Sequence, residues 1–73
     1  MEDIGTQIRR LRRRRKMTQE ELSERCEISI SYLSKIERRL RAPTVPILTR
    51  ISRAMDVELS SFDASYPATK SDA

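Results

Sequence analysis

Apolar residues recur every three or four positions along most of the chain, the spacing that places side chains on one face of an α-helix. Ile4, Ile8 and Leu11 form the first such series. Beyond Asp63 this periodicity stops, and we expect a flexible tail there. The pattern predicts four helices and a last short helical turn, at residues 2–16, 19–25, 30–38, from 45 up to a break at 56, and 59–62. The predicted domain covers residues 1–63, followed by a tail at 64–73.

Polar residues mark where three of these helices begin. Thr18 and Glu21 match the capping box, in which each side chain accepts a hydrogen bond from the other residue's backbone N–H. Ser29 and Thr44 are expected to cap the two following helices in a simpler way. Three helix starts are therefore predicted to within a residue.

The helices predicted at 19–25 and 30–38 are short and lie only a few residues apart, which is the layout of a helix-turn-helix motif. In this motif the first helix anchors the second, whose N-terminal half enters the DNA major groove. Apolar residues of the pair face inward, namely Leu22, Cys26, Ile28, Leu33 and Ile36. The opposite face of the second helix carries a strip of small or polar residues and one exposed isoleucine: Ile30, Ser31, Ser34, Lys35 and Arg38.

The length and composition of the chain reduce the number of function classes that fit it. Seventy-three residues are enough for one domain and too few for a deep enzyme cleft. Fifteen Lys and Arg residues, twelve of them Arg, oppose eleven Asp and Glu, for a formal charge of +4. Such a surface suits phosphate groups, although the charge also fits a merely soluble helical surface.

Several classes of site are not expected. The chain has no His, no Gly-rich phosphate loop and a single cysteine, so we predict no catalytic residue, metal site, cofactor or disulfide. We interpret Cys26 as a small buried core residue. The acidic, polar N-terminus is not a signal peptide, and no apolar run approaches the length of a membrane span. We expect a cytoplasmic protein of bacterial or phage type, associated with the nucleoid.

Seven of the eight residues from Arg9 to Lys16 are basic. This run has three interpretations: a row of phosphate contacts, a helix lying on a membrane surface, or a solvated face. The membrane interpretation is weak because the opposite face lacks Trp and Phe. Leu11 within the run indicates a charged helix face with one core contact, and whether the run touches a ligand stays open.

Taken together, residues 4–62 resemble the phage-repressor and Cro-like helix-turn-helix family, also called the xenobiotic-response-element type. The matching strings are IGTQIRRLR, MTQEELSE, ISISYLSKIER, PTV and LTRISRAMDV. The resemblance implies a compact, all-α, five-helix, lambda-repressor-like DNA-binding domain whose second and third helices form the motif. It also implies sequence-specific binding of double-stranded DNA, and a homodimer on a palindromic operator.

The resemblance assigns roles to individual residues. Base-reading roles fall on Ile30, Ser31 and Lys35; a lysine can donate to guanine, and an isoleucine can contact a thymine methyl group. Arg12 and Glu37 match an ion pair that ties the first helix to the third, with a weak surface pair as the alternative. Phosphate contacts fall on Thr18, Gln19, Tyr32, Arg38, Arg39 and Arg41. The core positions are the five inward residues named above, and Ser23 is the small residue where the two helices touch.

Two positions depart from the family pattern. The family usually has Gly in the turn where Glu27 stands, and often has Gly where Arg39 stands. A left-handed backbone at Glu27 would cost on the order of 1 kcal/mol. Arg39 would lose some turn stability and gain a phosphate contact.

These observations favour a small DNA-binding transcriptional regulator. The alternative is an antitoxin or a restriction–modification controller protein that binds its own operator. An antitoxin would also bind a partner toxin, through Ile47, Phe62 or the tail. A protein-interaction module that has lost DNA binding is a third reading. For the homodimer we expect contacts among Ile47, Met55, Leu59 and Phe62, with a plain core role as the alternative.

Overall fold

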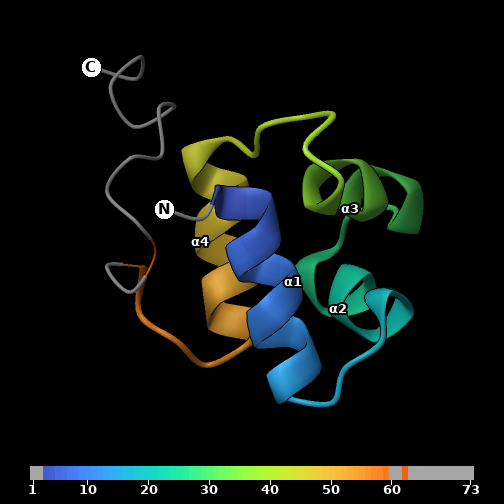
Figure 1. Ribbon diagram of the computed structural model, residues 1–73. Helices are drawn as coiled ribbons and strands as arrows, with labels where there is room; N and C mark the ends of the chain where they lie inside the picture. The colour runs from blue at the N-terminus through green and yellow to red at the C-terminus, as the bar shows by residue number, and fades with distance from the viewer. Residues whose placement is uncertain (1–2, 60–61, 63–73) are drawn as a thin grey trace.

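The computed structural model describes residues 3–59 and residue 62, and within them the chain forms four α-helices and no strand. Figure 1 shows α1 crossing in front of α4, with α2 and α3 beside them. The helix α2 packs against both α3 and α4, and α1 packs against α3. The prediction of an all-α domain is therefore confirmed. The helices are α1 (Ile4–Arg14), α2 (Gln19–Cys26), α3 (Ile30–Glu37) and α4 (Val45–Ala54).

Each helix starts at a side-chain cap. At α2, Thr18 Oγ1 accepts from the Glu21 N–H at 3.0 Å, and the Thr18 N–H donates to Glu21 Oε1 at 2.8 Å, which completes the capping box. Ser29 caps α3 and Thr44 caps α4, each by accepting from the backbone N–H three residues later. All three predicted caps are confirmed.

The first helix begins later than predicted. Asp3 lies just outside α1 and caps it, since its Oδ1 accepts the backbone N–H of Thr6 at 2.9 Å. This hydrogen bond is the main reason that the pKa of Asp3 lies below its ordinary value. The helix also ends at Arg14, so Lys16 lies outside it.

All four helices end in the same way. Each helix is followed, within two residues of its end, by one residue with a left-handed backbone. None of these residues is glycine: they are Lys16 (φ 58°), Glu27 (φ 60°), Arg39 (φ 66°) and Asp56 (φ 57°). Two backbone hydrogen bonds close each end in the pattern of a Schellman motif. At the end of α2, for example, the Ile28 N–H donates to the Ser23 carbonyl at 3.0 Å. The left-handed turn predicted at Glu27 is thus present.

The expected fifth helix is not found in the described part of the chain. Leu59 belongs to a 3₁₀ turn, and the N–H of Phe62 donates to the Leu59 carbonyl at 3.2 Å, one turn later. Residues 60–61, which fall within the predicted helix, lie outside the described residues, as does the predicted tail at 64–73.

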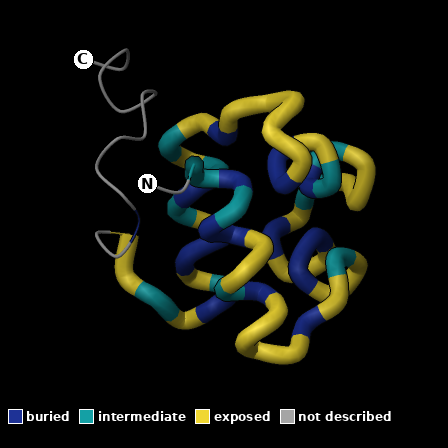
Figure 2. Tube along the Cα trace, in the orientation of Figure 1, coloured by how far each residue is buried: buried dark blue, intermediate teal, exposed yellow. Residues whose placement is uncertain are grey.

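The core lies where the four helices meet (Figure 2). Two of the residues that we placed at a dimer contact belong to it instead, since Met55 is fully buried and Phe62 is 7% exposed. The other two lie further out: Ile47 is partly buried against the core, and Leu59 is 40% exposed. The buried apolar residues are Ile8, Met17, Leu22, Cys26, Leu33, Ile36, Leu48, Ile51, Met55 and Phe62.

The one glycine of the sequence lies inside α1, where helix propensity disfavours it. A Cβ atom on Gly5 would overlap the backbone carbonyl oxygen of Ile36 and would lie 3.2 Å from that of Glu37. Gly5 therefore allows α1 to approach the last turn of α3 closely. This contact fixes the position of α3, which carries the candidate interface.

Candidate nucleic-acid interface

The third helix has two different faces. Leu33 and Ile36 are fully buried, so they hold α3 against the rest of the domain. On the other side Ser31 and Lys35 are exposed, and Ile30 is 47% exposed although it is apolar. The three predicted base-reading residues therefore share one accessible face of α3, with Ile30 and Ser31 at its start and Lys35 in its last turn. The opposite face of the same helix is packed into the core.

A buried ion pair connects α3 to α1. Arg12 Nε lies 2.7 Å from Glu37 Oε2 and Arg12 Nη2 lies 3.0 Å from Oε1, the two-point geometry that arginine favours with carboxylates. Arg12 Nη1 also donates to the Met17 carbonyl at 2.8 Å. The two side chains are only 10% and 2% exposed, so this is not the weak surface pair that the sequence left open.

The Glu37 carboxylate also holds a residue of α2. Gln19 Nε2 donates to Glu37 Oε1 at 3.1 Å. The side chains of α1, α2 and α3 are thus joined at one carboxylate. Because Gln19 is the first residue of α2, this network fixes the start of α2 relative to α3.

Thr18 and Gln19 are expected to contact phosphate through backbone N–H groups at the start of α2, and the two differ in the structure. The Thr18 N–H is already bonded to Glu21, so it is not available to a phosphate. The backbone N–H groups of Gln19 and Glu20 have no acceptor among the described residues. They carry the positive end of the helix dipole and are the available donors at this helix start.

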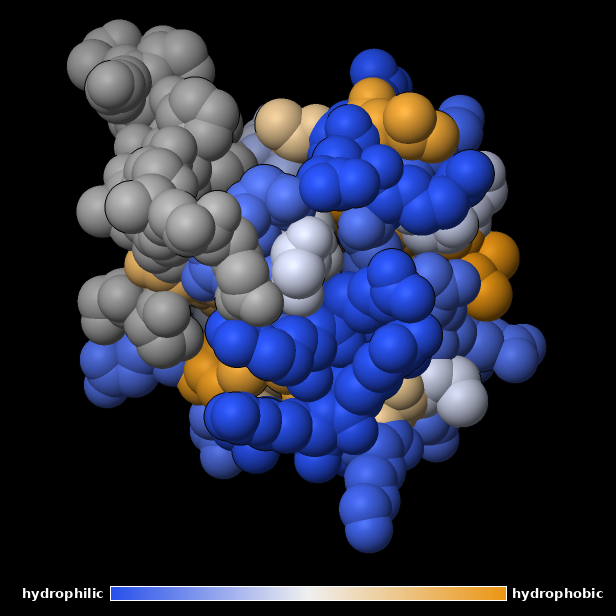
Figure 3. Space-filling view, in the orientation of Figure 1, coloured by the Kyte–Doolittle hydropathy of each residue, from blue (hydrophilic) through white to orange (hydrophobic). Residues whose placement is uncertain are grey.

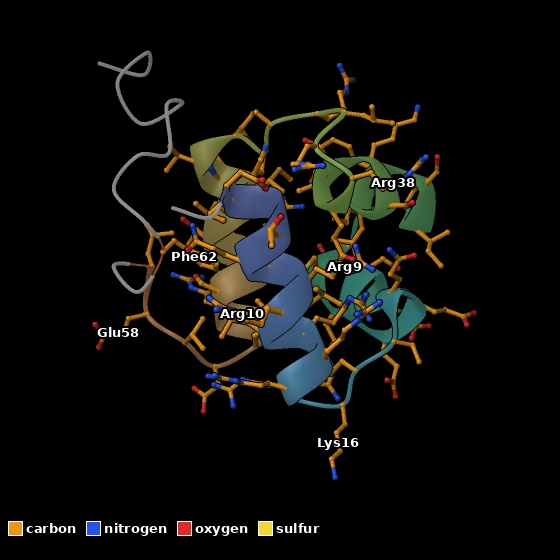
Figure 4. All side chains as sticks on the ribbon, in the orientation of Figure 1. Arg9, Arg10, Lys16, Arg38, Glu58 and Phe62 are labelled. Carbon is orange, nitrogen blue, oxygen red and sulfur yellow. The ribbon has the colours of Figure 1, made fainter. Side chains whose placement is uncertain are left out.

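A groove with a volume of about 690 Å³ opens between the end of α1, the start of α2 and the exposed face of α3. Four arginines line it: Arg12, which is paired with Glu37, and Arg9, Arg13 and Arg38. Figure 4 shows Arg9 on the side of α1 that faces α2 and α3. Ile30 lines the same groove, so the groove continues into the predicted base-reading face.

Arg9 and Arg13 belong to the basic run for which the sequence left phosphate contact open as one of three interpretations. They are four residues apart, on neighbouring turns of α1 and next to Arg12, which points inward. That helical position, next to a residue expected to pair with Glu37, is the signal in the sequence that could have found them. It does not show that a groove forms between α1, α2 and α3 at this place.

The remaining predicted phosphate residues have different surroundings. Arg38 Nε donates to Ser34 Oγ at 3.2 Å, which directs it along the face of α3. Arg39 forms an exposed pair with Asp3 at 3.3 Å, toward the start of α1. Arg41 is exposed, and Tyr32 is partly buried against the core. Arg38 is the one that borders the groove.

The five residues predicted to face inward in the helix-turn-helix motif lie in the core or at its margin. Leu22, Cys26, Leu33 and Ile36 are fully buried, whereas Ile28 packs at the margin of the core. Burial raises the pKa of the Cys26 thiol to about 11, so the thiol is protonated and unreactive at neutral pH. Ser23, 5% exposed, leaves room for the contact between the two helices.

Hydrophilic side chains cover most of the surface over α1 in the view of Figure 3. Among the described residues there is no group of three or more potential metal ligands. None of the helices in that part of the chain is long and apolar enough to cross a bilayer.

The same arrangement occurs in known proteins. The helix-turn-helix family HTH_3 matches residues 8–62. The chain belongs to this family. The resemblance inferred from the sequence strings is thereby confirmed.

Among curated relatives, the transcriptional regulator RamB of Mycobacterium tuberculosis is 39% identical over 67 residues, which is 92% of this chain. The match spans only 14% of the length of RamB. Among solved structures, SinR in complex with DNA superimposes with a TM-score of 0.76 at 34% identity, covering 80% of this chain and 94% of that one. The restriction–modification controller protein C.AhdI of Aeromonas hydrophila has a TM-score of 0.75 at 27% identity, covering 77% and 85%.

Proposed function

We propose that this chain binds duplex DNA in a sequence-specific manner as a transcriptional regulator, with α3 in the major groove. The observation that carries this proposal is the exposed face of α3, whose opposite face is locked in the core. A helix held rigidly from behind can present side chains to base edges in a fixed register. The similarity to SinR in complex with DNA supports the same mode of binding.

In this mode phosphate contacts supply affinity and base contacts supply specificity. Ile30, Ser31 and Lys35 read bases. The start of α2 and the arginines at the end of α3 contact the backbone. Positive charge around the groove attracts the DNA and makes the affinity depend on salt.

A random-site selection with the purified protein tests the proposal. One preferred duplex sequence should emerge, and Lys35→Ala should flatten the preference at one base position by about 1–3 kcal/mol. Arg25→Ala is a matched control, because Arg25 is an exposed cation of α2 and is not part of the exposed face of α3. Failure to enrich any sequence would contradict the proposal, as would equal effects of the two substitutions.

We also propose a homodimer on a palindromic operator, because one small module buries only about 600–1,000 Å² on DNA. Of the apolar residues considered for the contact, Ile47 and Leu59 are accessible enough to take part. Light scattering at micromolar concentration should give twice the monomer mass. Leu59→Lys should shift that mass toward the monomer, whereas a monomeric wild-type protein would contradict the dimer.

The alternative of an antitoxin or a controller protein fits less well than a general transcriptional regulator. The likeness to C.AhdI favours the controller side of it. The identity of the gene next to this one distinguishes these cases, since a controller would adjoin restriction and modification genes and an antitoxin would adjoin a toxin gene. Each of them uses the same DNA-binding face.

A further inference from the structure

We propose that Arg9 and Arg13 of α1, together with Arg38 of α3, form a binding site for one backbone phosphate of the DNA strand that borders the major groove. This inference rests on the proposed DNA binding and adds the first helix to the contact surface. The occupant is a DNA phosphate because the site opens onto the same groove as Ile30, at the start of the recognition helix.

Position on the helix selects these two residues out of the basic run. Successive residues of an α-helix are rotated by about 100°, so Arg9 and Arg13 lie next to each other, on the side adjacent to the buried Arg12. Arg10 and Arg14 lie further round, where with Arg9, Arg13 and Thr6 they border a second hollow of about 540 Å³. Figure 4 shows Arg9 and Arg10 on different sides of α1.

The charge balance of the groove is incomplete without an anion. The Glu37 carboxylate lies at its wall, but both of its oxygens are engaged by Arg12 and one also by Gln19. Glu20 is the other carboxylate at the groove. Among the described residues neither Arg9 nor Arg13 makes an ion pair or a side-chain hydrogen bond.

Guanidinium chemistry fits a phosphate at this place. Arginine binds phosphate oxygens through two parallel N–H groups, and three arginines from two helices can surround one phosphate. Ser34 Oγ accepts from Arg38 Nε at 3.2 Å, which leaves the terminal nitrogens of Arg38 for the groove. Affinity from this site is independent of base sequence.

The test measures binding of a selected duplex by fluorescence anisotropy across a salt series, comparing Arg9→Gln/Arg13→Gln with Arg10→Gln/Arg14→Gln. Both variants remove two charges from the same helix, so long-range attraction to DNA changes equally. One lost phosphate contact makes the slope of log K against log salt less steep by about 0.9. If the wild-type protein and the Arg9→Gln/Arg13→Gln variant bind equally well at 1 M salt, this slope difference makes the variant bind about eightfold more weakly than wild type at 0.1 M salt. At 0.4 M salt the variant should bind about twofold more weakly. The Arg10→Gln/Arg14→Gln variant should show less than half of that change in slope.

A second arm locates the phosphate. Uncharged methylphosphonate linkages are introduced one at a time along the duplex. One position should weaken binding of the wild-type protein about eightfold and have no further effect on the Arg9→Gln/Arg13→Gln variant. Arg9→Lys/Arg13→Lys keeps the charge and should retain most of the salt slope. Circular dichroism confirms that each variant is folded.

Equal salt slopes for the two double glutamine variants would overturn the inference while leaving DNA binding intact. The inference would also be overturned if every methylphosphonate linkage that weakens binding of the wild-type protein weakened binding of the Arg9→Gln/Arg13→Gln variant by the same factor. If the wild-type protein binds no duplex at all, the proposed function itself fails, and this inference fails with it.

Discussion

Replacing Glu27 with glycine should raise the free energy of unfolding, because Glu27 holds φ 60° and ψ 41° after α2. This left-handed conformation costs a residue with a Cβ atom about 1–2 kcal/mol. Glycine avoids that cost but adds freedom to the unfolded chain, which offsets about 0.4–1 kcal/mol. Glu27 is exposed, so little packing is lost. We expect a net gain of about 0.8 kcal/mol, which for a domain of this size raises the Tm by about 3–6 °C.

Glu24→Gly provides the matched control. Glu24 is also exposed and lies three residues earlier, inside α2. The same chemical change there should lower the free energy of unfolding by about 0.5–1 kcal/mol, because glycine is disfavoured within a helix. Thermal unfolding followed by circular dichroism, with urea unfolding to check that the m-value is unchanged, measures both.

The two substitutions are expected to change the Tm in opposite directions, and this contrast tests whether the backbone at Glu27 is strained. If Glu27→Gly lowers the Tm as Glu24→Gly does, the left-handed turn is not the source of strain. Asp56→Gly gives a graded comparison, since Asp56 has a similar φ of 57° but aspartate tolerates this conformation better. Its gain should be smaller than that of Glu27→Gly.

Three further predictions concern buried positions. Gly5→Ala should destabilise the domain by about 2 kcal/mol despite its better helix propensity, because the new methyl overlaps the Ile36 carbonyl, and an unchanged Tm would contradict this. Glu37→Gln should cost about 3 kcal/mol in urea unfolding by leaving the Arg12 charge buried. An Arg12→Met/Glu37→Leu double variant should recover most of that loss, and a failure to recover would show that the pair contributes more than its burial penalty. Cys26 should resist alkylation at pH 8 until the protein unfolds, because its pKa is raised to about 11 and the thiol is therefore almost entirely protonated at pH 8. Alkylation of the folded protein at the rate of a free thiol would refute its burial.

Local signals in the sequence predicted the helix-turn-helix well. Thr18, Ser29 and Thr44 cap helices where expected, because a cap is a hydrogen bond between residues only three apart. Asp3 caps α1 through the same kind of hydrogen bond, and the predicted start at residue 2 lies before this cap. The fifth helix was predicted from family resemblance and a short apolar pattern, and the described residues contain only a turn there.

The candidate site was predictable only in part. The exposed strip of α3 follows from helical periodicity, since its buried partners Leu33 and Ile36 are in the same helix. The groove beside it does not follow, because it is formed by α1, α2 and α3 together. Among seven basic residues in a run of eight, no local property separates Arg9 and Arg13 from Arg10 and Arg14.

The sequence by itself determined the elements of this protein: four helices, three of their starts, and one helix with an accessible polar face. Tertiary structure alone decided their arrangement. It buried the Arg12–Glu37 pair, which the family resemblance had suggested without fixing its surroundings, and brought α1 against α3 at Gly5. It also turned two of the basic residues of α1 toward the recognition helix. The physical reason is the separation in sequence of the residues that interact. Caps and helical periodicity depend on residues within about one turn of each other, whereas a groove between helices depends on contacts between residues far apart in the chain.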